Sequence, residues 1–136
     1  MRAIFIGIMV TLGAHHAPLF AQTPTPSSSA CLEPSRLLLE NIAAGMYVDG
    51  GGNLGEAGAV KSGSHANAFF VAARIHEPGV GGDIGVWATT SLDGSGPIIS
   101  VDDLAKEFSV FPDGGRMEVT YSMMDAGARE SHSCVR

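Results

Sequence analysis

The sequence is poor in charged, aromatic and cysteine residues. Only 16% of the 136 residues are charged and 7% are aromatic, with 8 basic residues against 14 acidic ones and a net charge of −6. The chain therefore lacks the clustered lysine and arginine that binding to nucleic acid or to an anionic membrane requires. Because 45% of the residues are hydrophobic, disorder through most of the chain is also excluded. We expect a single folded domain.

Long hydrophobic stretches are missing as well, apart from one near the N-terminus. Residues 3–12 form an apolar run behind a positively charged start; the run is too short to span a bilayer but is typical of an export signal. Leu19 and Ala21 fit the −3 and −1 positions of a cleavage site before Gln22. We predict a signal peptide over residues 1–21 and an exported mature protein with no membrane span.

The alternative for this segment is an N-terminal core helix, which residues 15–18 (HHAP) would interrupt. Residues 22–30 (QTPTPSSSA) hold no large apolar side chain, so they indicate an extended spacer that could also accept O-linked sugars. The spacing to the next cysteine does not fit a lipid-anchor signal. The folded domain is therefore expected to cover residues 31–136.

Only two cysteines occur, Cys31 and Cys134, at the two ends of the expected domain. In an oxidising compartment such a pair most simply forms a disulfide, and closing so long a loop stabilises a fold by about 4 to 5 kcal/mol. The alternative is a metal site joining His132 and Cys134 to His65 or His76. The spacings of a structural zinc site are absent, so we predict a Cys31–Cys134 disulfide and neither metal nor cofactor.

Two segments have helical periodicity. Apolar residues recur at spacings of three and four over residues 34–44, and Gly45 follows as a stop. Residues 101–109 form one apolar stripe behind a capping-box-like start at Ser100 and Asp103. Acidic residues in the first turn of a helix favour its dipole, which is a simpler reason for them than catalysis. We predict helices over both ranges.

Alternating apolar residues predict strands over 69–76 and 84–92, joined as a hairpin by the turn-forming residues 77–83. A third strand is predicted over 117–123, followed by a polar tail over 126–136 that only its cysteine holds. The glycine-rich residues 49–58 match the letters of G-x-G-x-x-G. No strand pattern precedes them and no helix pattern follows, so they predict a loop.

The predicted fold class is α+β in the order α-β-β-α-β. It consists of a small three-stranded, mainly antiparallel sheet with two helices on one face. The sequence leaves the order of the strands open, including a split β-α-β arrangement.

The candidate binding surface lies on the predicted hairpin. Phe70 and Trp87 fall on its less apolar face, together with Arg74 and Thr89, with the loop 77–83 at the rim. An exposed aromatic pair beside a cation predicts a partner-binding surface. The alternative is that the glycine-rich loop or the first helix covers the two aromatic rings.

Residues 84–112 (IGVWATTSLDGSGPIISVDDLAKEFSVFP) carry one resemblance. A VWAT strand leads into an I-x-x-V-D-x-x-A helix and then a serine with a short aromatic-proline end. This pattern resembles a segment of small exported actinobacterial proteins of unknown function. The resemblance implies export and carries no catalytic residue.

No catalytic motif is assembled; Ser95, for example, lacks the outer glycines of G-x-S-x-G. We therefore predict a non-enzymatic binding or interaction domain of the cell envelope or extracellular space, whose partner is another protein or a small ligand. The alternative enzyme is a small exported hydrolase that uses His76 with Glu77 or Asp83 at the hairpin tip. A purely structural envelope component is the third hypothesis.

Overall fold

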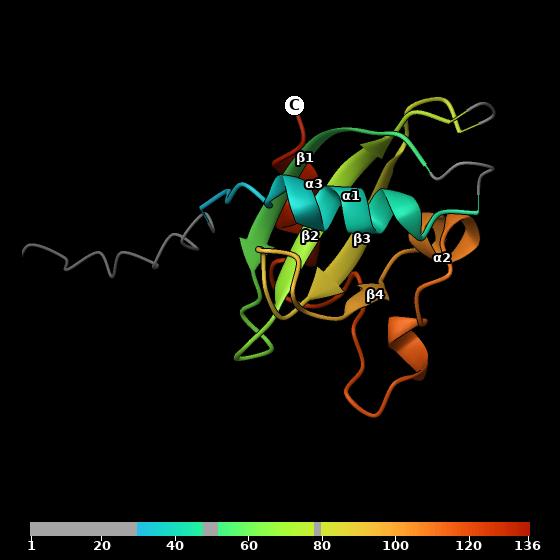
Figure 1. The fold of residues 1–136 in the computed structure, drawn as a ribbon. Coiled ribbons are helices and arrows are strands. Elements are labelled where there is room, and N and C mark those ends of the chain that lie inside the picture. Colours follow the sequence, from blue (N-terminus) through green and yellow to red (C-terminus); the bar gives the residue numbers. More distant parts are fainter. Residues whose placement is uncertain (1–29, 48–51, 78–79) are drawn as a thin grey trace, which may run out of the picture.

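A computed structural model of the protein describes residues 30–47, 52–77 and 80–136. The predicted signal peptide and all but the last residue of the predicted spacer lie outside the described residues. The fold is α+β, as predicted (Figure 1). Its elements in chain order are α1 (Arg36–Ala44), β1 (Leu54–Lys61), β2 (Phe69–Ile75), β3 (Ile84–Thr89), β4 (Ile98–Ser100), α2 (Asp103–Phe108), the 3₁₀ turn η1 (Gly114–Arg116) and α3 (Ala128–Ser133).

The two helices predicted from periodicity are present as α1 and α2. Ser35 caps α1, because its hydroxyl accepts a hydrogen bond from the backbone N–H of Leu38 at 3.1 Å. The cap of α2 is Asp102, whose carboxylate accepts from the N–H of Ala105 at 2.8 Å. The predicted cap, Ser100, is instead the last residue of β4 and is fully buried.

The sheet has four antiparallel strands in the order β1-β2-β3-β4, rather than three. The predicted hairpin is confirmed as β2 and β3, with Val71 opposite Trp87 and Phe70 opposite Ala88. Since each strand pairs with the next one along the chain, the sheet is a meander, and the split arrangement does not occur.

Strand β1 includes residues that were predicted to form a loop. Glycine weakens a strand pattern, so Gly55 and Gly58 hide the alternation of this segment. Both are needed for close approach: a Cβ atom on Gly58 would lie 2.5 Å from the Cβ of Cys134, and one on Gly55 would collide with the imidazole of His76. The glycines of β1 are therefore a consequence of packing.

The strand predicted over 117–123 does not form. The η1 turn ends at Arg116, and residues 117–123 are irregular chain in which Met117 is 36% and Val119 55% exposed. The outer edge of β4 is occupied by the chain at Pro112 and Asp113, because the N–H of Ser100 donates to the carbonyl of Pro112 at 2.9 Å. An alternating sequence forms a strand only where a sheet edge is free to pair with it.

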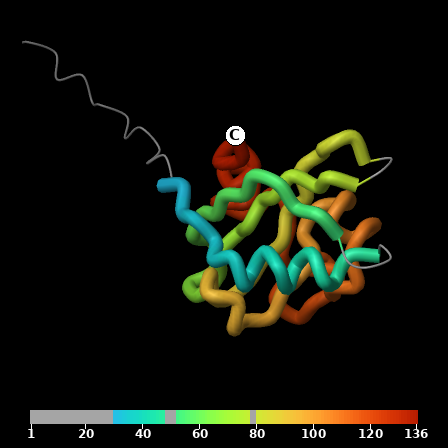
Figure 2. Tube along the Cα trace, turned by 45° about the horizontal axis from the view of Figure 1, so that its top comes forward, coloured from blue at the N-terminus to red at the C-terminus, as the bar shows by residue number. Residues whose placement is uncertain are grey.

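Helices cover both faces of the sheet instead of one. In Figure 1, α1 lies in front of the sheet and α3 behind it, and the rotated view in Figure 2 also separates them. One buried cluster joins Leu38 and Ile42 of α1 to Trp87 of β3 and Ala105 of α2. A second cluster, on the opposite face, includes Ala128 of α3. The sheet is thus the middle layer of the domain.

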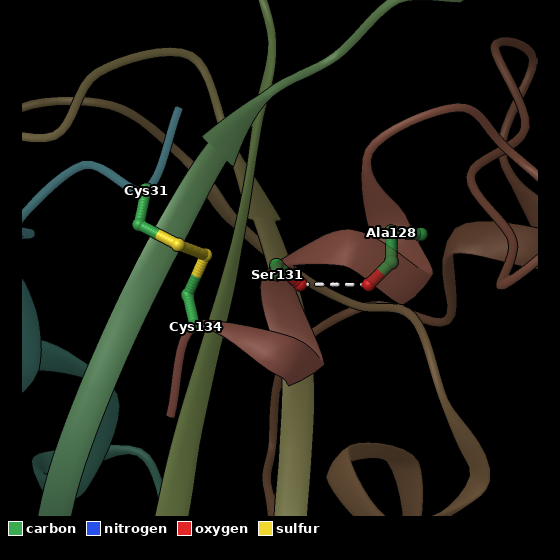
Figure 3. The surroundings of a disulfide bond; sticks show 4 residues. All are labelled: Cys31, Ala128, Ser131 and Cys134. Carbon is green, nitrogen blue, oxygen red and sulfur yellow. Dashed lines mark hydrogen bonds between the residues drawn. A yellow bond between two sulfur atoms is a disulfide. The ribbon is translucent and has the colours of Figure 1, made fainter. Parts of the chain in front are cut away.

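Helix α3 replaces the predicted polar tail. It starts after Gly127, which has a left-handed φ of +103°, and the carboxylate of Glu130 accepts from the N–H of Gly127 at 2.9 Å. Ala128 and Ser131 are its buried residues, and the Ser131 hydroxyl donates to the Ala128 carbonyl at 2.7 Å (Figure 3). These small side chains let a polar sequence pack closely against β2.

Candidate functional site

The predicted disulfide between Cys31 and Cys134 is confirmed. Its Cα atoms lie 5.6 Å apart, and the two cysteines are 103 positions apart in the sequence. Figure 3 shows the bond beside β1, where it joins the chain ahead of α1 to the end of α3. Cys134 is consequently not available to share a metal with His132. In the part of the chain that the structure describes, no helix has the length and hydrophobicity needed to cross a membrane.

The predicted binding surface is not assembled. Phe70 and Trp87 are both 0% exposed and Thr89 is 2% exposed. Val71, not Phe70, lies opposite Trp87, so the two aromatic rings fall on opposite faces of the sheet. One ring is covered from the α1 side and the other from the α3 side. Of the four residues, only Arg74 remains partly exposed.

Trp87 is instead part of a buried hydrogen-bonded group. Its indole N–H donates to the hydroxyl of Ser109 at 3.3 Å, and this oxygen lies 3.0 Å from that of Ser100. Ser109 also donates to the carbonyl of Ala105. Because each buried polar atom of this group has a partner, the group anchors the end of α2 to the sheet.

His76 is 46% exposed, and its surroundings differ from those assumed for a hydrolase. Its Nε2 lies 4.0 Å from a carboxylate oxygen of Glu56, a residue of β1. The carboxylate of Glu77 accepts from the N–H of Asn53 at 2.6 Å. Hydrogen bonding from its own backbone amide, followed by Arg74, lowers the pKa of Glu56 below its usual value. A lowered pKa makes the Glu56 carboxylate a weaker candidate for a general acid.

A groove of about 380 Å³ is where the structure gathers residues that the sequence identified separately. It is lined by Arg74, Gly82, Asp83, Ile84, Leu104 and His132, which come from β2, the β2–β3 turn, β3, α2 and α3. Three of these residues were considered in separate hypotheses on the sequence. Arg74 belongs to the predicted binding surface, Asp83 to the hydrolase alternative and His132 to the metal-site alternative. Leu104 belongs to the apolar stripe predicted over residues 101–109, and nothing in that pattern indicated its place in the groove.

The guanidinium group of Arg74 is held in place at the groove. Its Nε lies 3.2 Å from the Glu56 carboxylate, and its Nη1 donates to the Gly82 carbonyl at 2.9 Å. Glu56 is a second residue that sequence analysis missed, because it lies in the segment predicted to be a loop. The groove therefore has a fixed cation on one wall.

Asp102 joins the start of α2 to β3. Its carboxylate accepts hydrogen bonds from the N–H groups of Val86 at 3.1 Å and Ala105 at 2.8 Å. Burial raises its pKa above the usual value, and these two hydrogen bonds and the charge of His132 act in the opposite direction. The ionised form of this carboxylate is therefore less favoured in the folded protein than in the unfolded chain.

We expect Asp102→Asn to leave the free energy of unfolding unchanged or higher at pH 7, because the amide oxygen can still accept both hydrogen bonds. Asp102→Ala should lower it by about 1 to 2 kcal/mol, since the cap of α2 is lost. An acid whose folded pKa is raised loses stability as the pH rises from its unfolded value of 3.8. Any advantage of Asp102→Asn in urea unfolding should therefore shrink as the pH is lowered towards 3.8 and be absent below that value. An Asn variant as unstable as the Ala variant would contradict this.

A second polar group has a structural role. Nε2 of His65 lies 3.4 Å from the carboxylate of Asp125, and its ring is 4.6 Å from that of Tyr121. The N–H of Ala126 donates to the hydroxyl of Ser64 at 3.0 Å. These contacts fasten the β1–β2 connection to the chain that precedes α3.

The chain matches no protein-family model, no curated protein and no solved structure.

Proposed function

We propose that the protein is an exported binding domain rather than an enzyme, and that its ligand occupies the groove lined by Arg74, Asp83 and His132. The observation that carries this proposal is the convergence in the groove of a cation, a carboxylate and an imidazole from three elements, beside apolar Ile84 and Leu104. A few convergent polar groups on an apolar concave surface are typical of small-molecule sites.

The composition of the groove favours binding over catalysis. None of the described residues that line it carries a hydroxyl or a thiol that could act as a nucleophile. Within the described chain, the ion pair within 4.0 Å of Arg74 is with Glu56, and Asp83 and His132 form no such pair with each other. A base held by an acid beside a nucleophile, which covalent catalysis needs, is thus missing from this groove.

The disulfide supports a location outside the cytoplasm, because such bonds persist in oxidising compartments. The resemblance of residues 84–112 to exported proteins agrees with this. The predicted signal peptide would direct the export, and the envelope or the extracellular space would be the site of action.

Fractionation of cells that express the full chain tests the location. We expect the protein outside the cytoplasm, with an N-terminus at Gln22, no titratable thiol before reduction and two afterwards. A cytosolic protein that still starts at Met1, with both thiols free, would overturn the proposal of export.

A fragment screen by amide NMR tests the site. Binding compounds should shift the amide signals of Gly82, Ile84 and Leu104 and lose affinity in Arg74→Gln. Glu40→Gln, on a separate cavity beside α1, is the matched control and should bind as the wild type does. Binders that act only elsewhere would remove the groove as the site. Ester hydrolysis that disappears in His76→Ala would favour the hydrolase instead.

A further inference from the structure

We infer that the groove lined by Arg74, Asp83 and His132 binds a small zwitterion of the α-amino acid type, with an aliphatic side chain. This inference rests on the proposed function and specifies its ligand. It starts from the two opposite charges in the groove. Among the described residues, Arg74 forms an ion pair with Glu56, and no ion pair within 4.0 Å joins Arg74 to Asp83. Both charges thus face one groove without neutralising each other.

The cationic side suits a carboxylate. A guanidinium group has five N–H donors in a rigid fork. In Arg74, Nε donates to the Glu56 carboxylate and Nη1 donates to the Gly82 carbonyl. The two N–H donors of Nη2 take part in neither bond. Because the guanidinium is already fixed, little side-chain entropy is lost when a ligand carboxylate binds. The exposed His132 adds a second donor on the α3 side.

The anionic side suits an ammonium group. Asp83 is exposed, and its backbone is fixed at the start of β3, since its carbonyl accepts from the N–H of Ile75 at 2.8 Å. Its carboxylate forms no ion pair within 4.0 Å among the described residues. An ammonium group is the cation that would pair with it by a charge-assisted hydrogen bond.

Ligands with one charge fit less well. A simple anion that approaches Arg74 also meets the carboxylates of Glu56 and Asp83, whereas a simple cation at Asp83 meets Arg74. Like charges brought together weaken binding, and matched charges strengthen it. A ligand that carries its own carboxylate and ammonium a few atoms apart is therefore the complementary one.

The rest of the groove determines the third substituent. Ile84 and Leu104 are half-buried and are its apolar lining residues. An aliphatic ligand side chain would cover them and gain from the burial of apolar surface. The described lining contains no Phe, Tyr or Trp ring, the side chains on which a sugar most often stacks. A volume of about 380 Å³ lies at the small end of the range for ligand sites.

The probe is L-leucine, titrated into the full mature domain and followed by amide NMR and calorimetry. Leucine should shift the amide signals of Gly82, Ile84 and Leu104. Leucine amide, which lacks the carboxylate, and N-acetyl-leucine, which lacks the ammonium, should each bind about tenfold or more weakly, because each loses one charged hydrogen bond.

Two variants test the cation and the anion of the groove separately. Arg74→Gln and Asp83→Asn should each weaken leucine by about tenfold or more. Asp83→Asn should leave N-acetyl-leucine binding unchanged or stronger, because that ligand has no ammonium to lose. Asp103→Asn is the matched control. It removes an exposed acid that is next to Leu104 in the sequence but does not itself line the groove, so it should change the affinity for neither ligand.

Two outcomes would overturn the inference in different ways. If N-acetyl-leucine or leucine amide binds as tightly as leucine, or if only other fragments enter the groove, the zwitterion is the wrong ligand class although the groove remains a binding site. If neither leucine nor any fragment of the screen shifts a groove amide of the folded protein, the proposed site fails together with its ligand.

Discussion

Removal of the disulfide in Cys31→Ala/Cys134→Ala is expected to lower the free energy of unfolding by about 4 to 5 kcal/mol, because the bond closes a loop of about a hundred residues in the unfolded chain. The two cysteines are separated by 103 positions. Small domains are stable by only about 5 to 15 kcal/mol. Urea unfolding of the oxidised protein, the reduced protein and the variant measures the effect.

The structure also predicts which element unfolds first when the disulfide is reduced. Helix α3 has six residues, fewer than a helix needs to be stable by itself, and Cys134 lies at its end. After reduction, the amides of Ala128–Ser133 should exchange hydrogen faster than those of β2 and β3, whose residues form much of the buried core.

Ser133→Ala, an exposed change on the same helix, is the matched control and should preserve both the stability and the exchange pattern. Equal urea midpoints for the oxidised and the reduced protein would show that the bond does not brace the fold.

Replacement of Trp87 by alanine is expected to lower the free energy of unfolding by about 3 to 5 kcal/mol, as large-to-small changes in cores do. The indole is 0% exposed and lies in the cluster between the sheet and α1. Its removal leaves a cavity and takes the N–H donor away from the Ser109 hydroxyl. Thermal and urea unfolding, with tryptophan-independent detection by circular dichroism, measures the loss.

Trp87→Phe separates the two contributions. The smaller ring keeps much of the apolar packing and loses the hydrogen bond to Ser109, so the loss should be less than that of Trp87→Ala. An alanine variant as stable as the wild type would show that Trp87 is not a core residue. The expected loss also means that a failure of this variant to bind a partner would report unfolding.

Local sequence patterns were sufficient for several elements. The three- and four-residue spacing identified α1 and α2, and the alternation of the hairpin identified β2 and β3. These patterns are reliable because each depends on neighbours within one element. The disulfide followed from the predicted export to an oxidising compartment and from cysteine number, since two cysteines allow one intramolecular pair.

Elements that depend on distant partners were missed. The glycines of β1 are explained only once Cys134 and His76 are seen against them. The alternating segment over 117–123 has a strand-like sequence, yet Pro112 occupies the sheet edge that it would need. In α3, small buried residues replace the apolar stripe by which a helix is usually recognised.

The candidate site shows the same division. The sequence by itself determined the chemical types of Arg74, Asp83 and His132, the pair of cysteines and the alternation within each strand of the hairpin. Only the tertiary structure decided that Phe70 and Trp87 lie on opposite faces and that one groove collects residues from five elements. The reason is that alternation fixes the sides of one strand, whereas the register between strands and the packing of helices decide which sides meet.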